Sequence, residues 1–341
     1  MPSPSPAPRL LMNLLGDETK ASSRVRGYWI ADELRDLGWQ VRIDHATSKS
    51  GLLKIAAGLP FQDVVLFQKV CTRYHPTLLA IAKRAGVKVA YDIDDFPPGD
   101  AQSNAVQVTQ KMMRKSDLVM AGSGALLAYA AGFNEAAHLV RTGVKVDNYA
   151  AAPSQADAKP CIGWIGNGRT YRRDLIEVLG PPLAAVAREH PLRLRLIGSV
   201  GEADLYDYFE TLQGVEVDFL DQIAWGDPAA VRAALAPVDI GVYPLLPGGL
   251  NDYKCGFKAL EYMASAIPTI ASTAPGNADL IMDGQDGLLV DSPAAWEAAL
   301  RQLITDPARR QTIGETGRTR VMGELSTRAL ARQVDQLLRP A

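Results

Sequence analysis

The sequence predicts an α/β protein that contains two doubly wound parallel sheets, one in each half of the chain. Segments typical of strands alternate with segments typical of helices in both halves, as parallel sheets with crossover helices require. The stretch 148–160 is rich in Ala, Pro, Ser, Gln and Asp and has the composition of a linker. A chain of 341 residues also suits two domains better than one. We therefore expect two domains facing a central cleft.

The first domain is expected over residues 9–150. Residues 1–8 are rich in Pro and Ser, lack the apolar core of a signal peptide, and are predicted to be a disordered tail. Residues 9–15 form a buried strand in this interpretation, and residues 23–37 an amphipathic helix that ends at Gly38. Further strands are predicted at 40–44, 64–67, 87–93 and 118–121, with helices at 76–85 and about 104–115.

The second domain is expected over residues 151–325. Its first strand is predicted at 162–165 and its first helix at 173–189, followed by strands at 193–197 and 215–219 and helices at 228–235 and 293–304. A last helix is predicted at 327–338, in a C-terminal segment 326–341 that is expected to pack back on the first domain.

Composition excludes several classes of protein. The net charge of −2 gives no general attraction to nucleic acid or to anionic lipid. Three widely spaced cysteines suggest neither a disulfide framework nor a zinc site. The longest weakly polar run, 118–133, is too short to span a membrane. We expect a cytoplasmic protein whose contact with a membrane, if any, is peripheral.

The most informative block runs from Asp239 to Ile281. A strand ends in a loop rich in Gly, Pro and Asn, and the next helix carries Lys258 and Glu261 on an apolar body. A second strand then ends in a turn at Gly276 and Asn277 that opens another helix. Two helix N-termini thus reach one sheet edge, where unpaired amides and helix dipoles favour an anion. This layout is typical of a nucleoside-diphosphate site.

These segments resemble glycosyltransferase family 4, the group 1 glycosyl transferases. The string LEYMASAIPTIAS at 260–272 resembles the family signature, with Glu261 as the second of its two glutamates. Lys254 stands in place of the first glutamate, and 17–26 replace the glycine pair of the first loop. Further similarities lie at 163–166, at 141–144, at 275–277, which corresponds to the family's second Gly-Gly loop, and at 283–290.

The resemblance implies the GT-B fold, with two Rossmann-like domains. It implies transfer of a sugar from a nucleotide-diphosphate donor, UDP- or GDP-linked, to a saccharide or lipid-linked acceptor in polysaccharide or lipopolysaccharide synthesis. It also implies retention of anomeric configuration, no cofactor and no metal. The donor is expected on the second domain and the acceptor against the first.

Donor-site residues follow from the resemblance and from local chemistry. In the family the carboxylate at Glu261 holds the ribose hydroxyls. Arg169, Arg172, Arg173 and Lys258 are the cations available for the diphosphate, and we rank Arg169 and Arg173 first among the arginines. The backbone at Gly166 and Gly168 leaves a strand and enters a helix, so that it reaches the same phosphate. The other donor-side candidates are Lys254, Gly276 and Asn277.

In the first domain, Asp92 and Asp94 end a strand and point the same way. The carboxyl end of a parallel strand faces the crevice, so we expect them to contact acceptor or sugar. The alternative is that Asp94 and Asp95 cap the turn at 96–98. Arg24 and Arg26 lie in a helix's first turn, where cations oppose the dipole, which indicates an anionic ligand on the acceptor side.

Two other functions stay open. A GT-B sugar-nucleotide epimerase shares the fold and the donor site but needs no acceptor. A two-lobed sensor of small molecules also fits a cleft, although such sensors are usually exported and this sequence shows no signal peptide. A dinucleotide-dependent dehydrogenase is excluded, because no G-x-G-x-x-G follows the first strand.

Overall fold

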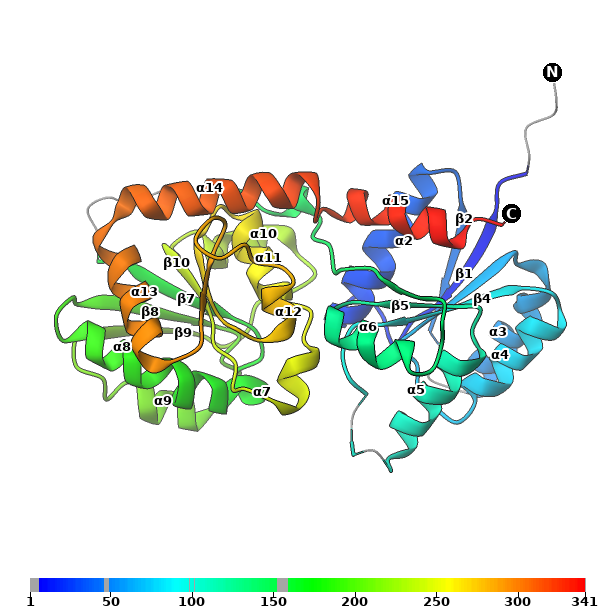
Figure 1. The fold of residues 1–341 in the computed structure, drawn as a ribbon, viewed down its shortest axis with the longest axis horizontal. Coiled ribbons are helices and arrows are strands. Elements are labelled where there is room, and N and C mark those ends of the chain that lie inside the picture. The colour runs from blue at the N-terminus through cyan, green and yellow to red at the C-terminus, as the bar shows by residue number, and fades with distance from the viewer. Residues whose placement is uncertain (1–5, 46–48, 98, 101, 152–158, 341) are drawn as a thin grey trace, which may run out of the picture. The chain divides into compact units, whose positions relative to one another are not determined.

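The computed structural model describes residues 6–45, 49–97, 99–100, 102–151 and 159–340. The predictions for residues 1–5 and for 152–158 of the linker lie outside these ranges. The chain divides into two compact units. Unit 1 comprises Met1–Gly143, Tyr253–Cys255 and Thr327–Ala341, and unit 2 comprises Val144–Asp252 and Gly256–Ser326. Each unit is built on a six-stranded parallel sheet, so the predicted fold class is confirmed (Figure 1).

The sheet of unit 1 has the strand order β2-β1-β3-β4-β5-β6. Successive residues alternate between its two faces: Leu11 and Val65 face one apolar core, whereas Leu10 and Val64 face the other. The strands are β1 (Arg9–Asn13), β2 (Gln40–Asp44), β3 (Val64–Gln68), β4 (Lys88–Ile93), β5 (Leu118–Ala121) and β6 (Ala137–Leu139).

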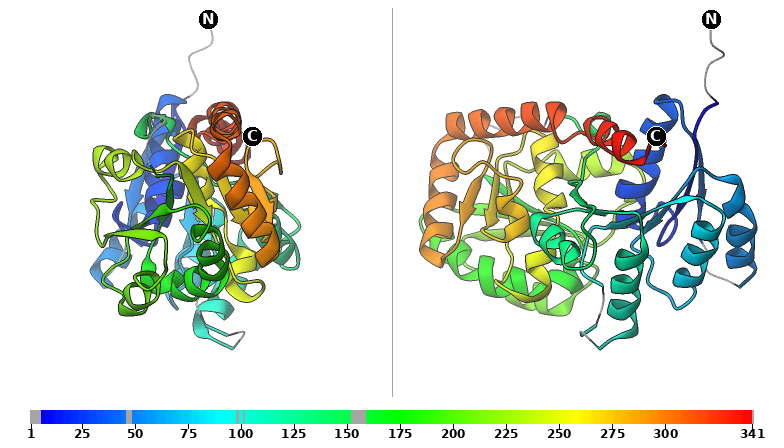
Figure 2. Two further views of the ribbon diagram at one scale, coloured as in Figure 1. Left: turned by 90° about the vertical axis from the view of Figure 1, so that its left-hand side faces the viewer. Right: turned by 45° about the vertical axis from the view of Figure 1, so that its right-hand side comes forward.

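Helices cover both faces of this sheet. Residues of α3 (Lys49–Gly58), α4 (His75–Arg84), α5 (Asn104–Lys115) and α6 (Gly124–Ala131) share one core, and residues of α2 (Trp29–Asp36) and α15 (Thr327–Leu338) share the other. A short α1 (Ala21–Ser23) and a π-helical stretch, Arg24–Tyr28, lead into α2. The last helix, α15, lies beside α2 (Figures 1 and 2), and Trp39 Nε1 donates to Asp335 Oδ1 over 2.6 Å.

The sheet of unit 2 has the strand order β12-β11-β10-β7-β8-β9. Three of its inner strands are buried along their whole length, as expected for parallel strands covered on both sides, whereas the edge strand over 215–220 is only partly buried. They are β7 (Cys161–Ile165), β8 (Leu192–Ile197), β9 (Val215–Leu220), β10 (Ile240–Tyr243), β11 (Thr269–Ser272) and β12 (Leu288–Val290).

The first helix of unit 2 has three parts: α7 (Gly168–Arg173), a π-helical stretch Asp174–Leu179, and α8 (Gly180–Ala187). Both units thus carry a π-helical stretch in the helix that follows their first strand, a feature often found at functional sites. The other helices are α9 (Ala203–Phe209), α10 (Pro228–Leu235), α11 (Phe257–Ala264), α12 (Pro275–Ala278), α13 (Pro293–Thr305) and α14 (Pro307–Gly323).

Sequence reasoning missed four of these helices: α3, α6, α9 and α14. The longest, α14, is polar overall and contains Gly314 and Gly317, so its sequence lacks a strong apolar stripe. The glycines permit close packing, because a Cβ at Gly314 would lie 2.1 Å from the carbonyl oxygen of Ala266. Tertiary contact with α11 stabilises a helix whose sequence alone does not indicate one.

Each sheet has one position where the chain reverses its direction of winding. In unit 1 this switch point lies between β1 and β3, and in unit 2 between β7 and β10. Open parallel sheets bind ligands outside the carboxyl ends of the strands at such points. In unit 2, the helices that carry Arg169 and Lys258 follow the two strands that flank the switch point, β7 and β10. In unit 1, Arg26 follows β1, which flanks the switch point, and Asp92 lies on β4, the neighbour of β3.

Candidate functional site

A pocket of about 590 Å³ opens at the switch point of unit 2. One side comes from the start of the helix after β7, and the other from the loop after β10. The lining residues are Arg169, Thr170, Arg172, Arg173, Asp174 and 246–251. The pocket therefore presents three arginines on a chain whose overall charge is close to zero.

The arginines are held loosely. Arg169 Nε lies 3.1 Å from Glu202 Oε2, and Arg173 Nε lies 2.7 Å from Glu177 Oε1. Their side chains are 74% and 68% exposed, respectively. Ion pairs this exposed contribute little to stability, so an incoming anion can replace the carboxylates at low cost. Arg172, ranked below the other two from sequence, lines the same pocket and also pairs with Glu202.

Asp174 fixes the opposite wall of the pocket and was missed by sequence reasoning. This aspartate is buried at the start of the π-helical stretch. It accepts hydrogen bonds from Leu246 N at 2.7 Å and from Asn251 Nδ2 at 2.8 Å. Its partners lie more than 70 positions away in the chain, and no local spacing marks it in the sequence.

Lys258 is buried on the first turn of α11 among three aromatic rings. Its Nζ lies 3.5 Å from the ring centroid of Tyr171, 4.7 Å from that of Tyr243 and 5.7 Å from that of Trp164. Among the ion pairs of the described residues, none involves Lys258. A Cβ at Gly166 would lie 2.6 Å from Lys258 Cε, so the lysine stem requires glycine there. The ammonium is thus stabilised by ring faces and retains capacity for an anion.

Glu261 lies one turn further along α11 and is also buried. Its Oε1 accepts a hydrogen bond from the hydroxyl of Tyr149 over 2.9 Å. The alternative that Lys258 and Glu261 form a simple ion pair on a solvated helix face does not hold, because both side chains are buried and the lysine meets aromatic rings. Their positions fit a role in a binding site better than a role on the surface.

The glycine positions after β7 are explained by close packing. A Cβ at Gly168 would lie 2.5 Å from the carbonyl oxygen of Ser199, and Gly168 N donates to Gly198 O over 2.8 Å. Asn167 caps the helix through a hydrogen bond from Thr170 N. Packing within the protein thus accounts for glycine at this position, and contact of the Gly166 and Gly168 backbone with a phosphate stays a prediction.

The turn at Gly276 and Asn277 differs from the sequence expectation. The helix it opens, α12, is a single turn, and the amides of Asn277 and Ala278 both donate to Ala274 O. Asn277 is buried and donates its Nδ2 to Ser272 O over 2.9 Å. This turn offers an anion much less than the full helix N-terminus that we expected.

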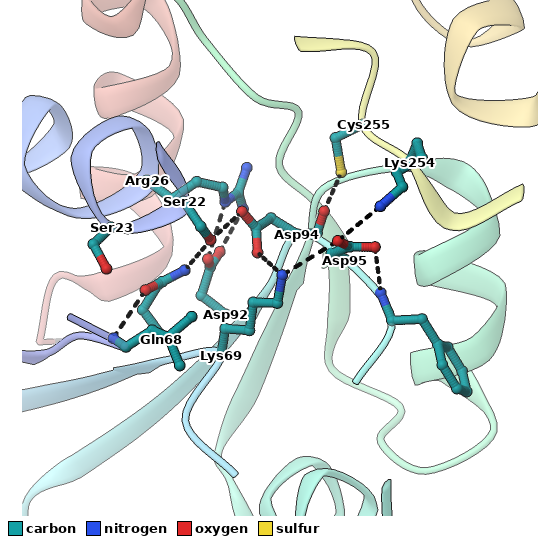
Figure 3. Close-up of polar contacts among 12 residues, drawn as sticks. Ser22, Ser23, Arg26, Gln68, Lys69, Asp92, Asp94, Asp95, Lys254 and Cys255 are labelled. Carbon is teal, nitrogen blue, oxygen red and sulfur yellow. Dashed lines mark hydrogen bonds and ion pairs between the residues drawn. The ribbon is translucent and has the colours of Figure 1, made fainter. Parts of the chain in front are cut away.

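In unit 1, Arg26 and Asp92 form a buried ion pair (Figure 3). Arg26 Nε donates to Asp92 Oδ2 over 2.9 Å, and a second bond joins Nη2 to Oδ1. Arg26 Nη1 also donates to Val140 O at 2.7 Å. Burial raises the pKa of Asp92, and Arg26 partly offsets that effect. Arg26 and Asp92 therefore neutralise each other's charge, and their contact with a ligand stays a prediction.

Arg24 also has a partner within the protein. It is buried, and its Nη1 donates to the carbonyl oxygen of Glu18 over 3.0 Å. The chain enters α1 already at Ala21, and Arg24 begins the π-helical stretch instead of the first turn of a regular helix. Because the helix starts earlier than predicted, the dipole effect expected at Arg24 from the sequence does not apply in that form.

Two lysines and two aspartates adjoin the Arg26–Asp92 pair (Figure 3). Lys69 Nζ lies 3.6 Å from Asp94 Oδ1 and 3.4 Å from Asp95 Oδ2, and Lys254 Nζ donates to Asp95 Oδ2 over 3.0 Å. Burial favours the neutral form of Asp94, but Lys69 and Arg26 outweigh it and lower its pKa below the ordinary value. Lys254, expected at the donor site, belongs to unit 1 and not to the unit with the arginine pocket.

The carboxylates of this cluster are thus engaged by cations of the protein. Among the described residues, no three His, Cys, Asp or Glu side chains converge as a metal site would require. Asp95 also accepts a hydrogen bond from Phe96 N over 3.0 Å, which is the capping role weighed as an alternative. Within the same described residues, every helix is too short or too polar to cross a membrane.

The architecture is that of GT-B proteins. Sucrose-phosphate synthase from Thermosynechococcus elongatus superposes with a TM-score of 0.69 at 18% identity, over 97% of this chain and 98% of that one. Anabaena HepE in complex with UDP-glucose gives 0.71 at 16% identity, over 97% and 99%. These likenesses establish the fold.

The family follows from sequence similarity. Residues 159–306 match the model described as glycosyl transferases group 1. D-inositol 3-phosphate glycosyltransferase of Kineococcus radiotolerans is 29% identical over 217 residues, 54% of this chain and 47% of that protein. The capsular polysaccharide glycosyltransferase CapM of Staphylococcus aureus is 24% identical over 52% of this chain and 45% of its own. The chain spans about half the length of these relatives. The resemblance to group 1 glycosyl transferases found in the sequence is confirmed over residues 159–306, which lie in unit 2, and the fold is GT-B.

Proposed function

We propose that the protein transfers a sugar from a nucleoside-diphosphate donor to an acceptor hydroxyl, with the donor bound to unit 2. The observation that carries this proposal is the burial of Lys258 and Glu261 one turn apart on α11, next to the glycine loop after β7. A buried cation and a buried carboxylate at a switch point match the two ends of a nucleotide: the diphosphate and the ribose.

The diphosphate is the group that the cations would hold. Transfer of the sugar leaves negative charge on the departing diphosphate, and fixed positive groups stabilise that charge best in a site shielded from water. Lys258 is already shielded by Tyr171, Tyr243 and Trp164. Arg169 and Arg173 are exposed and are free to turn from Glu202 and Glu177 toward phosphate oxygens.

The ribose would be held by Glu261. A carboxylate accepts hydrogen bonds from two neighbouring hydroxyls, and such charge-assisted bonds are among the strongest that proteins make. The Tyr149 hydroxyl donates to one carboxylate oxygen and so fixes the orientation of the group before the ligand arrives. Preorganisation of this kind lowers the entropic cost of binding.

The proposal extends to a reaction that retains anomeric configuration and needs no metal ion. Asp92, Asp94 and Asp95 are the acidic cluster considered from sequence, and each is paired with Arg26, Lys69 or Lys254. These pairings leave the diphosphate charge to Lys258 and the arginines. The acceptor is a saccharide, free or lipid-linked, and it would bind against unit 1. UDP is the first donor nucleotide to test, because the HepE structures contain UDP or UDP-glucose.

A coupled experiment tests this function. Calorimetry with UDP, GDP, ADP, CDP and dTDP identifies the nucleotide, and incubation of the matching labelled nucleotide-sugars with mixed saccharide acceptors detects a glycoside product. We expect one nucleotide to bind and its sugar to appear in a new glycoside. Appearance of an epimerised sugar without acceptor product would instead indicate an epimerase. Absence of binding by every nucleotide would refute the donor site.

A further inference from the structure

A group of aromatic side chains in unit 1 has no role in the function proposed above. The ring of Phe96 lies 4.7 Å from that of Tyr253 and 5.1 Å from that of Tyr129, centroid to centroid. All three side chains are half-buried. Gln110 Nε2 donates to the Tyr129 hydroxyl over 3.0 Å and fixes that ring from below. We call Phe96, Tyr129 and Tyr253 the aromatic platform.

Polar groups lie directly beside this platform. Asp95 precedes Phe96 in the chain and Lys254 follows Tyr253, and Lys254 Nζ donates to Asp95 Oδ2 over 3.0 Å (Figure 3). The same ion pair thus joins the backbone segments that carry two of the rings. The Asp95 and Lys254 side chains are 29% and 20% exposed, so a ligand resting on the platform can reach both.

The charges of the adjoining cluster balance. Arg26, Lys69 and Lys254 are matched by Asp92, Asp94 and Asp95 through the ion pairs described above. The cluster therefore has no surplus positive charge, in contrast to the arginine pocket of unit 2. A phosphate brought here would meet three carboxylates within the same cluster, which is unfavourable, whereas uncharged hydroxyl groups find both donors and acceptors.

The backbone beside the cluster is strained. Lys69 adopts a left-handed conformation with φ of +52°, and its amide donates to Asp92 O over 2.8 Å. A non-glycine residue pays for such a conformation with stability, and residues of this kind concentrate where function demands a fixed geometry. Here the strain places the Lys69 ammonium between Asp94 and Asp95.

We propose that the aromatic platform and the Asp95–Lys254 pair bind an uncharged sugar ring of the acceptor. The C–H face of the sugar stacks on Phe96 and Tyr253, and its hydroxyls donate to Asp95 and accept from Lys254. This inference deepens the proposed function and rests on it: it names the acceptor class as a neutral saccharide, in contrast to a phosphorylated one. Asp95, and not the more deeply buried Asp92 or Asp94, is then the carboxylate that contacts the acceptor.

Binding of simple glycosides tests the inference without relying on turnover. Saturation-transfer NMR is recorded on the full chain, at saturating UDP or whichever nucleoside diphosphate binds. The probes are methyl glycosides of glucose, galactose, mannose and N-acetylglucosamine, with glucose 6-phosphate as the charged probe. We expect at least one methyl glycoside to bind, with transfer strongest to the protons of one ring face. We expect glucose 6-phosphate to bind no more tightly than that glycoside.

Leucine variants distinguish stacking of a sugar on the rings from the contribution of these side chains to packing within the protein. Phe96→Leu and Tyr253→Leu keep apolar volume but remove the ring, and each should weaken glycoside binding about tenfold or more while leaving nucleotide affinity unchanged. Phe61→Leu, an exposed aromatic elsewhere in unit 1, is the matched control and should change neither.

The outcomes distinguish this inference from the function on which it rests. Three results would overturn the acceptor assignment while nucleotide binding still supports the donor site. They are no binding of any methyl glycoside, unchanged glycoside binding in both ring variants, and much tighter binding of glucose 6-phosphate. Loss of all nucleotide binding overturns the donor site instead.

Discussion

The ammonium of Lys258 lies 3.5 Å from the centre of the Tyr171 ring, between the helix that follows β7 and the helix that follows β10. These are the two connections that flank the switch point of unit 2. A buried lysine usually has a carboxylate partner, because burial of an unpaired charge is costly. Here aromatic faces take that role, so the charge is preserved for an anion.

Removal of the Lys258 charge should weaken binding of the diphosphate specifically. Lys258→Met keeps the length of the side chain and its contact with the rings. We expect the affinity for UDP to fall by roughly 10–100-fold, because a charge-assisted bond to phosphate is worth about 1.5–3 kcal/mol. Affinity for uridine should not change. Calorimetry on both ligands checks this, with Arg188→Met at an exposed position of unit 2 as control. Equal losses for UDP and uridine would contradict a phosphate contact.

Disruption of the Arg26–Asp92 pair should destabilise unit 1. Arg26→Met leaves the Asp92 carboxylate buried without its partner, at a cost of about 3–5 kcal/mol. The double variant Arg26→Met/Asp92→Leu removes both charges and should recover much of that loss. Urea unfolding followed by circular dichroism measures both. If the single variant is as stable as the parent protein, the pair is not the structural element described here.

Acidification should destabilise unit 1 through His75. Burial lowers the pKa of this histidine from 6.5 to about 4. Between these values the unfolded chain binds a proton that the folded chain excludes, so the free energy of unfolding falls as pH decreases from 6.5 to 4. The full difference corresponds to about 3 kcal/mol.

A substitution isolates the contribution of His75 to this pH dependence. His75→Gln retains an acceptor for Thr72 but cannot gain a proton, so its melting temperature should vary less between pH 7 and pH 5. Exposed His138 is the matched control, and His138→Gln should leave the pH dependence of the parent protein in place. An unchanged pH dependence in the His75 variant would show that other groups are responsible.

Turnover should not depend on a divalent metal. In our proposal Lys258, Arg169 and Arg173 meet the diphosphate charge, and the three aspartates of unit 1 are paired with cations. Treatment with EDTA should therefore leave the rate of sugar transfer nearly unchanged. A loss of activity that Mg²⁺ or Mn²⁺ restores would contradict this mechanism and would assign a metal-binding role to carboxylates of the protein.

Much of the fold follows from local sequence patterns. The helices at Asn104–Lys115 and Thr327–Leu338 carry clear apolar stripes, and their predicted limits agree with the structure. Helix α14 was not predicted, because Gly314 disfavours a helix in isolation and its close contact with Ala266 cannot be seen in the local sequence. Local pattern is sufficient where one face of an element is buried against a continuous core, and it fails where a distant segment supplies the stabilisation.

In the candidate site, too, local motifs could be predicted from the sequence, whereas long-range contacts could not. Lys258 and Glu261 stand three positions apart in a recognisable motif, so sequence alone indicates them. The Lys254–Asp95 pair joins residues 159 positions apart, and Asp174 reaches a loop more than 70 positions away. Arg26 and Asp92 were each noticed from sequence, but their 66-residue separation hid the ion pair that satisfies both. A sequence alone does not show which charged residues pair with each other, so each one can be mistaken for a ligand-binding residue.

The central claim is that unit 2 binds a nucleoside diphosphate through α11, and calorimetric titration of Glu261 variants tests it most directly. Glu261→Ala removes the proposed bonds to ribose and should weaken binding of the cognate nucleotide by about 2–4 kcal/mol. Tyr149→Phe removes the hydrogen bond that orients the carboxylate but leaves the carboxylate itself, so it should cause a smaller loss of affinity. The melting temperature of each variant confirms that it is folded. Unchanged affinity in a folded Glu261→Ala protein, or no binding of any of the five nucleoside diphosphates by the parent protein, would contradict the account.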